Sequence, residues 1–266
     1  MLSISAYLFL ASRRKLVKRN LQIAFPELSY LQLKVISVKT INRTIEQGLL
    51  VFAWPLLSEN RIKRSFPIST VSLEKLNRLN NSGSGILWLI PHFCHADALS
   101  FLKPKSQVNA LYRPLRNPVF DDFVKKSRQR FGVKTIDRKD GGMLKTLKVL
   151  KRGHTLAMLF DQNAGGAGTR LPFMGTDCSC TTLPDILYNK YKPKVLFVYT
   201  RRTGFWKSTF EVEEMGELET DKLVIEKANE WLEDKLRNDS NLRTSWLWMH
   251  QRWKPNVGQP RKGKIR

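Results

Sequence analysis

Five consecutive apolar residues at positions 86–90 (ILWLI) constrain the fold of this 266-residue chain more than any other feature. The run follows a turn-rich break at 80–85 (NNSGSG) and is closed by Pro91. A continuous apolar run of strand length between turn residues is typical of a strand that is buried on both faces. Because parallel sheets with helices on both sides contain such strands, the run indicates a layered α/β fold.

Other segments alternate between strand-like and helix-like patterns. The predicted strands are 86–90, 108–112, 155–160 and 195–199, and the predicted helices are 31–53, 118–130, 141–152 and 224–236. The chain is close to the roughly 250 to 300 residues at which a single hydrophobic core stops growing, so one domain is expected, the alternative being two small domains. The sequence predicts a single layered α/β domain with a central mostly parallel or mixed sheet flanked by helices. In such sheets ligands usually bind near the carboxyl ends of the strands.

The charge balance indicates an anionic partner. The chain has 46 Lys and Arg residues against 23 Asp and Glu residues, a formal net charge of +23. Residues 1–26 carry five basic groups and residues 251–266 carry six, and neither segment contains an acidic group. Such an excess attracts nucleic acid, anionic lipid headgroups or an acidic carrier protein. Composition alone does not choose among these three.

The N-terminal segment fits a membrane surface better than a membrane span. Residues 1–11 (MLSISAYLFLA) are apolar but shorter than the about 20 residues that a spanning helix needs. The basic residues follow this stretch, whereas in a secretory signal they precede it. Residues 15–25 mix cations with apolar side chains, as in helices that lie in a bilayer interface. We therefore expect residues 1–26 to form a membrane-interface segment, the alternative being a first helix packed on the core.

The candidate catalytic residues follow the apolar run directly, in PHFCHAD at 91–97. His92 and Asp97 form an H-x4-D pair at the carboxyl end of the predicted strand. If Asp97 lies in the first turn of the next helix, its carboxylate can hold one imidazole nitrogen of His92 while the other accepts a proton. That arrangement activates a hydroxyl nucleophile. The spacing is common by chance, and the alternative is a histidine and an aspartate that merely cap a strand and a helix.

Two other chemistries use the same segment. His92, Cys94 and His95, with Cys178 and Cys180, include ligand types suited to zinc, although their spacing matches no familiar zinc motif. Cys94 could instead be a covalent nucleophile, which requires a lowered thiol pKa.

Three further polar clusters adjoin predicted strands, at 112–118, 136–140 and 160–166. Arginines in the first two can clamp phosphates or an oxyanion, the alternative being a solvated basic surface. The glycines of the third cluster lack the Lys-Ser/Thr of a phosphate-binding P-loop.

These clusters occur in an order that resembles a known family, the bacterial lipid A late acyltransferases (lauroyl and myristoyl transferases) of the lysophospholipid acyltransferase superfamily. The motifs that carry the resemblance are RRKLVKRNLQIAFPELS, PHFCHAD, LYRPLRNP, IDRKDGG, FDQNAG, MGTDCSCTTLP and SWLWMHQRWKP, in this order along the chain. The resemblance covers nearly the whole sequence. It implies a glycerol-phosphate acyltransferase-like fold, with an acyltransferase domain at 27–254 and a basic tail at 255–266.

By the same resemblance, the acyl donor is an acyl carrier protein thioester and the acceptor is a phosphorylated glycolipid, a lipid A precursor. The expected location is the cytoplasmic face of the inner membrane, with peripheral or shallow attachment, and neither a metal nor another cofactor is implied. Another glycolipid or a lysophospholipid is the alternative acceptor. A nucleic-acid-binding protein without catalysis is a third reading, against which the ordered motifs and the apolar N-terminus argue.

The resemblance also assigns roles to individual residues. It makes His92 the general base and Asp97 its orienting partner, with Arg138 and Asp161 as additional active-site residues. We further expect Arg113 and Arg116 to bind the substrate, through acceptor phosphates or the acidic carrier.

Overall fold

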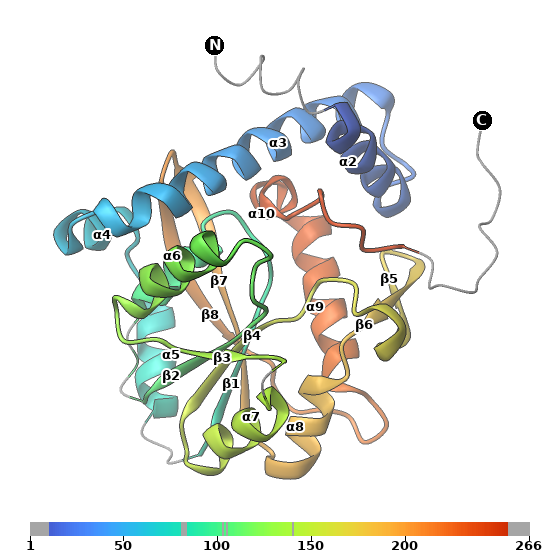
Figure 1. Cartoon of the computed structure of the whole chain (residues 1–266). Coiled ribbons are helices and arrows are strands. Elements are labelled where there is room, and N and C mark those ends of the chain that lie inside the picture. Colours follow the sequence, from blue (N-terminus) through green and yellow to red (C-terminus); the bar gives the residue numbers. More distant parts are fainter. Residues whose placement is uncertain (1–10, 81–83, 103, 105, 140, 255–266) are drawn as a thin grey trace.

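A six-stranded sheet forms the centre of the molecule, in the order β3-β2-β4-β1-β7-β8 (Figure 1). The computed structural model describes residues 11–80, 84–102, 104, 106–139 and 141–254. The strands are β1 (Ile86–Ile90), β2 (Val108–Tyr112), β3 (Lys134–Asp137), β4 (Thr155–Leu159), β7 (Lys194–Gly204) and β8 (Lys207–Glu214). Neighbouring strands are parallel except β7 and β8, which are antiparallel. The predicted α/β class with a mostly parallel central sheet is therefore confirmed.

Strand β1 lies in the middle of this sheet, between β4 and β7. All five of its residues are buried. Ile86, Trp88 and Ile90 pack into the hydrophobic core on one face of the sheet, and Leu87 and Leu89 pack into the core on the other face. Because successive side chains of a strand point to opposite faces, a strand covered on both sides must be apolar at every position.

Helices cover both faces of the sheet, and the long helix α3 runs along the top of the molecule in Figure 1. The α-helices are α2 (Ala11–Ala24), α3 (Tyr30–Ala53), α4 (Glu59–Ser65), α5 (Thr70–Asn80), α6 (Pro118–Gln129), α7 (Gly142–Lys151), α8 (Leu183–Tyr191), α9 (Val224–Asn238) and α10 (Ser240–Ser245). Short 3-10 turns are η1 (Trp54–Leu56), η2 (Ala96–Phe101) and η3 (Gly165–Ala167), and a small hairpin is formed by β5 (Thr169–Phe173) and β6 (Thr176–Cys180). None of the helices in the described part of the chain is long and apolar enough to cross a membrane.

Helix α3 begins and ends where its sequence indicates. Ser29 and Gln32 form a reciprocal capping box at its start, in which each side chain accepts a hydrogen bond from the other residue's backbone N–H. The α-helix ends at Ala53. Trp54 keeps right-handed helical angles (φ −53°, ψ −44°), and Pro55, which has no N–H to continue the hydrogen-bond ladder, lies in the 3-10 turn η1. The helix thereby has a fixed register, which matters because its middle turns reach the candidate active site.

The sequence did not predict every element. Strands β3 and β8, the β5–β6 hairpin and helix α8 were missed, and β7 continues past the expected end at Tyr199 to Gly204. Strand β8 buries only alternate residues, among them Phe210 and Val212. At the edge of a sheet such a strand has a mixed polar composition that lacks the signal of a continuous apolar run.

Helix α2 packs on the main body of the molecule. Val17, Leu21 and Phe25 are buried in the core, and the Asn20 side-chain amide donates to the backbone carbonyls of Trp248 and His250, both at 2.7 Å. Its apolar side thus faces protein. The apolar residues 1–10 and the basic residues 255–266 lie outside the described residues, and an interfacial role for residues 1–26 stays a prediction.

Candidate active site

His92 and Asp161 lie opposite each other at the carboxyl ends of the neighbouring strands β1 and β4. In the parallel register Ile90 is the partner of Leu159, so His92 and Asp161 each stand two residues beyond the same pair. The Nδ1 atom of His92 is 2.5 Å from Asp161 Oδ1, and the backbone N–H of His92 donates to Asp161 Oδ2 at 2.8 Å. Asp161 therefore holds both the ring and the backbone of His92.

The Asp161 carboxylate is buried and ionised. Burial by itself raises the pKa of Asp161, but His92, through its charge and its two hydrogen bonds, and the indole N–H of Trp246, at 2.6 Å, together lower that pKa to about 2. An ionised acceptor beside Nδ1 favours the tautomer in which Nδ1 carries the proton. The Nε2 atom of His92 is then free to accept a proton.

The opposite side of the imidazole faces the Gln162 side chain. Gln162 Nε2 lies 3.0 Å from His92 Nε2, and because an amide nitrogen only donates, Nε2 of the ring accepts. The His92 side chain is 19% exposed, enough for a substrate group to reach it. Gln162 thus occupies the position that a proton-donating hydroxyl needs.

A C-terminal segment fixes the loop that carries His92. The backbone N–H of Leu247 donates to the carbonyl of His92 at 3.0 Å, and Phe93 pairs with Trp246 as an isolated antiparallel bridge. The chain from Ser245 to Leu247 therefore runs beside the loop after β1 and helps to fix the position of His92.

The prediction that Asp97 holds an imidazole nitrogen of His92 is wrong. Asp97 Oδ1 accepts two hydrogen bonds from Arg128, from Nε at 3.0 Å and Nη2 at 2.6 Å, while Oδ2 accepts from the Gln47 amide at 2.8 Å. The physical reason is strand register, which brings Asp161 to the imidazole. Asp97 instead lies in η2, after a left-handed turn at His95 (φ 70°), where it meets helices α3 and α6.

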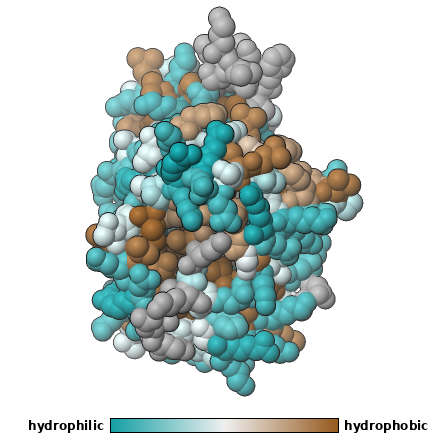
Figure 2. Space-filling model, turned by 90° about the vertical axis from the view of Figure 1, so that its left-hand side faces the viewer, coloured by the Kyte–Doolittle hydropathy of each residue, from teal (hydrophilic) through white to brown (hydrophobic). Residues whose placement is uncertain are grey.

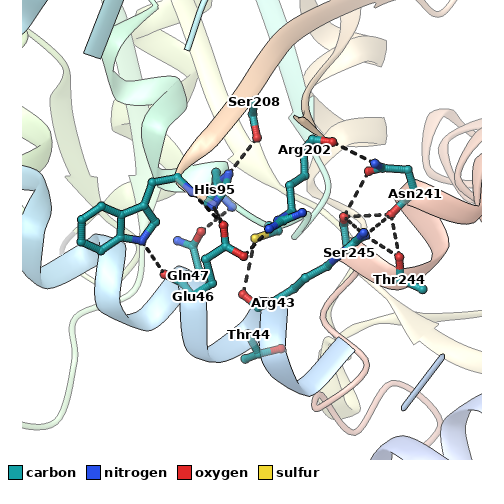
Figure 3. A network of polar contacts seen from close by, with 12 residues as sticks. Arg43, Thr44, Glu46, Gln47, His95, Arg202, Ser208, Asn241, Thr244 and Ser245 are labelled. Carbon is teal, nitrogen blue, oxygen red and sulfur yellow. Dashed lines mark hydrogen bonds and ion pairs between the residues drawn. The ribbon is translucent and has the colours of Figure 1, made fainter. Parts of the chain in front are cut away.

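A buried polar network supports this turn (Figure 3). His95 is fully buried, with Nε2 3.0 Å from Glu46 Oε1 and Nδ1 2.7 Å from Ser208 Oγ. Glu46 also accepts from Arg202 Nε at 2.9 Å and from the backbone N–H of Trp206 at 2.8 Å. Burial opposes ionisation of Glu46, but its contacts with His95, Trp206 and Arg202 give a net lowering of its pKa. The network ties α3 to the β7–β8 hairpin and so fixes His95.

The structure contradicts Cys94 as a nucleophile. Cys94 is buried, and burial, with a smaller contribution from Glu46, raises the pKa of its thiol to about 12. The thiol donates to the backbone carbonyl of Arg43 at 3.4 Å instead. A protonated thiol is a poor nucleophile.

The cysteine and histidine set considered for zinc is not assembled in the described part of the chain. Cys180 lies in β6 with its sulfur 3.2 Å from Arg252 Nη2. The donor atoms that do gather, from Glu46, Cys94 and His95, lie within 4.8 Å of one another. Arg202 already supplies the positive charge beside Glu46, so these residues do not fit a metal ion.

An apolar cavity of about 220 Å³ opens beside His92. Its walls come mainly from one face of strands β1, β2 and β4, and its polar lining residues come from the loop after β1 and from α3 and α6. The apolar lining includes Trp88, Ile90, Leu99, Val108, Ala110, Val133, Ala157 and Leu159, and the polar lining includes Arg43, Gln47, His92, Asp97 and Arg128. Such a cavity suits an elongated apolar group whose polar end remains near His92.

The remaining predicted residues lie at the same edge of the sheet but outside this cavity. Arg138 is exposed at the end of β3, and its backbone N–H donates to the Tyr112 carbonyl at 2.9 Å. Strand β2 separates β3 from β4, so Arg138 is not brought to Asp161. Arg113 and Arg116 are exposed between β2 and α6.

Four residues of the site were not assigned roles from the sequence: Gln47, Arg128, Gln162 and Trp246. Gln162 and Trp246 belong to the motifs FDQNAG and SWLWMHQRWKP, so their place in these motifs could have marked them as site residues. Gln47 and Arg128 lie in polar stretches of helices, where a single glutamine or arginine is indistinguishable from a surface residue.

Comparison with known proteins gives two matches. A family model described as bacterial lipid A biosynthesis acyltransferase matches residues 2–255. The lipid A biosynthesis lauroyltransferase of Escherichia coli (strain K12) is 31% identical over 147 residues, which cover 53% of this chain and 46% of that protein. The match therefore spans about half the length of this relative.

Proposed function

The chain belongs to the bacterial lipid A biosynthesis acyltransferase family, and on that premise we propose that it transfers a fatty acyl chain from an acyl carrier protein thioester to a hydroxyl of a lipid A precursor at the inner membrane. One observation carries the proposal. A histidine oriented by a buried carboxylate stands at an apolar cavity, so that a base and a site for an alkyl chain adjoin.

The cavity is the site for the acyl chain. Along β1, His92 stands four residues beyond Trp88, or roughly 13 Å at the rise of a strand. A chain lying along this strand keeps its thioester carbonyl near His92 while its methylene groups contact Ile90, Trp88 and Ala157. Burial of each methylene group contributes about 0.8 kcal/mol. Chain length is therefore selected by how far the cavity extends.

His92 is the general base. The acceptor hydroxyl displaces the Gln162 amide from His92 Nε2 and gives its proton to that nitrogen as its oxygen attacks the thioester carbonyl. The Asp161 carboxylate then stabilises the imidazolium through the Nδ1–H hydrogen bond. The tetrahedral intermediate collapses by breaking the carbon–sulfur bond, and the carrier thiolate takes a proton from the imidazolium as it leaves.

Arg128, which lines the cavity, supplies the cation that meets the oxyanion. It gives Nε and one Nη nitrogen to Asp97, which leaves its other Nη group outside that ion pair. Asp97 is accordingly a positioning residue, which acts by orienting Arg128 at the cavity.

Arg113, Arg116 and Arg138 serve the charged parts of the substrates. All three are exposed at the carboxyl edge of the sheet. Exposed guanidinium groups bind phosphate oxygens and attract an acidic protein surface. They thus receive the phosphates of the acceptor or the acidic carrier.

The test is transfer by the purified chain. Acyl carrier protein thioesters of several lengths and a tetra-acylated lipid A precursor are incubated with the protein in detergent, and the mass of the lipid is followed. An added acyl group that disappears with His92→Ala supports the proposal. Transfer only to a lysophospholipid or another glycolipid contradicts the acceptor, and full transfer by His92→Ala contradicts the base.

A further inference from the structure

Helix α3 presents large apolar side chains to solvent at both of its ends. Leu31 is 70% exposed in the first turn and Phe52 is 58% exposed at the other end, where Leu49 is exposed as well. Leu56, which is 85% exposed, follows in the turn η1. Leu31 and Leu49 are 18 residues apart, which is five helical turns, so their side chains point in the same direction. Leu31, Leu49 and Phe52 thus share one side of α3, and Leu31 and Leu49 are about 27 Å apart along the helix.

Helix α6 extends this apolar side. The ring of Phe52 lies 5.3 Å from that of Phe120 and 6.1 Å from that of Phe123, and Val119 beside them is 78% exposed. The same two helices also contribute lining residues to the acyl cavity, Gln47 from α3 and Arg128 from α6. We call Leu31, Val35, Leu49, Phe52, Leu56, Val119, Phe120 and Phe123 the α3–α6 apolar face. Both helices therefore border the cavity as well as carrying this face.

Cations gather at one end of the α3–α6 apolar face. A second hollow, of about 190 Å³, lies between α2 and α3 and is lined by Arg14, Lys15, Lys18, Tyr30, Leu33, Lys34 and Ser37. None of the described residues that line it is acidic. Lys18 and Lys34 are exposed, and Lys18 Nζ lies 4.5 Å from the centre of the Tyr30 ring. A hollow with four cations and no carboxylate attracts phosphate oxygens.

Cations also lie near the opposite end of the α3–α6 apolar face, after Leu56. Helix α4 begins three residues after Leu56 and carries exposed Arg61, Lys63 and Arg64. Figure 2, which looks at the side where α4 lies in Figure 1, shows patches of hydrophobic surface beside strongly hydrophilic ones. Apolar side chains with flanking cations are the pattern of surfaces that lie in the interface of an anionic bilayer.

We propose that the α3–α6 apolar face inserts into the interface of an anionic bilayer, with lipid phosphates in the hollow between α2 and α3, which brings two helices that border the acyl cavity to the membrane. The apolar residues enter the boundary between headgroups and acyl chains, and the lysines keep their ammonium groups at the phosphates. The biological sense of this orientation rests on the proposed function, because a lipid acceptor reaches His92 without leaving the bilayer. The binding surface itself is measured without any acyl transfer.

A fluorescent probe at one position tests the insertion. The cysteines of the described chain, Cys94, Cys178 and Cys180, are buried, so a surface cysteine can be labelled selectively. Leu56→Cys and Leu144→Cys carry an environment-sensitive dye, Leu144 being an exposed leucine of α7, which lies at the opposite end of the molecule from α3 in Figure 1. On addition of vesicles of phosphatidylcholine and phosphatidylglycerol, we expect a blue shift and a several-fold rise in emission at position 56 and no change at position 144. Vesicle-bound protein with an unchanged dye at 56 overturns the proposal.

Vesicle flotation with substituted proteins tests the two parts of the surface. Phe52→Ser with Leu56→Ser weakens binding about tenfold, because apolar area no longer enters the interface. Replacement of Lys15, Lys18 and Lys34 by alanine weakens binding about 100-fold at low salt, because each of the three cations contributes about fivefold near an anionic surface. The control replacement of exposed Lys190, Lys192 and Lys194 leaves binding nearly unchanged, because these residues lie at the end of α8 and the start of β7, on the side of the molecule opposite α3 in Figure 1.

The outcomes separate the possible partners. Equal losses in the test and control sets contradict a defined docking face. Binding to an acidic protein but to no vesicle contradicts a bilayer as the occupant. Since the vesicles contain neither thioester nor acceptor, a failure of acyl transfer leaves this result unaffected.

Discussion

The Asp161 carboxylate contacts His92 twice, at ring Nδ1 (2.5 Å) and at the backbone N–H (2.8 Å), although the two residues are 69 positions apart. Hydrogen bonding at two points fixes the direction of the imidazole as well as its tautomer. The remaining ring nitrogen, Nε2, therefore faces Gln162 without any need for the nearby Asp97.

Replacement of His92 by alanine is expected to lower kcat for acyl transfer by roughly 10²- to 10⁴-fold, because the acceptor hydroxyl loses its base. The measurement is initial transfer rate at saturating thioester. His154→Ala, at the opposite end of the sheet just before β4, is the matched control and keeps full activity. An equal loss in both variants points to unfolding, which circular dichroism detects.

Asp161→Asn is expected to make the free energy of unfolding less dependent on pH in the acidic range. The folded-state pKa of Asp161, about 2, lies below its ordinary value of 3.8, so the ionised carboxylate stabilises the fold above pH about 4 and this contribution is lost as the pH falls toward 2. The difference in free energy of unfolding between wild type and variant should shrink by about 2 kcal/mol over that range. Urea unfolding at pH 6 and pH 2.5 measures it, and a constant difference contradicts the assignment.

Asp97 and Arg128 are expected to act as one unit. Asp97→Asn and Arg128→Gln each lower kcat/KM about tenfold or more, and the double variant is no worse than Arg128→Gln alone. The pH dependence of kcat/KM stays unchanged in Asp97→Asn, because His92 keeps Asp161. If the pH dependence of kcat/KM shifts in Asp97→Asn, Asp97 is the orienting partner of His92 after all.

Ala110→Leu is expected to shorten the acyl chain that the enzyme prefers. Ala110 is half-buried and lines the cavity, and leucine adds three carbons to its side chain. The acyl chain of the preferred thioester should become about three carbons shorter, because the packed residues around the cavity cannot move apart without strain. Competition between thioesters of different length measures the preference. Ala167→Leu, at an exposed position in η3, leaves it unchanged.

Glu46→Gln is expected to destabilise the fold by about 3 kcal/mol, because the change leaves the Arg202 guanidinium without its carboxylate in a largely buried network. Thermal and urea unfolding give the value. Glu217→Gln, at an exposed position after β8, changes stability by less than about 0.5 kcal/mol. A similar small effect at Glu46 shows that the ion pair contributes little.

Much of the fold was predictable because its central elements have strong local signals. The run at 86–90 is apolar at every position, and a strand between two layers admits no other pattern. Strands β3 and β8 lack that signal, since β3 is short and half-exposed and β8 buries only alternate residues. The strand order follows from contacts between distant segments, which no local pattern records.

The sequence by itself determined the fold class, His92 as the candidate base and the family resemblance, because each depends on local patterns or on the order of motifs. Only the tertiary structure decided the partner of His92. Asp97 is five residues away along the chain, but the left-handed turn at His95 directs it to Arg128. Asp161 is distant in sequence, yet the parallel register of β1 and β4 places it beside the imidazole. Hydrogen bonding depends on distance in space, and in a sheet that distance is set by strand pairing.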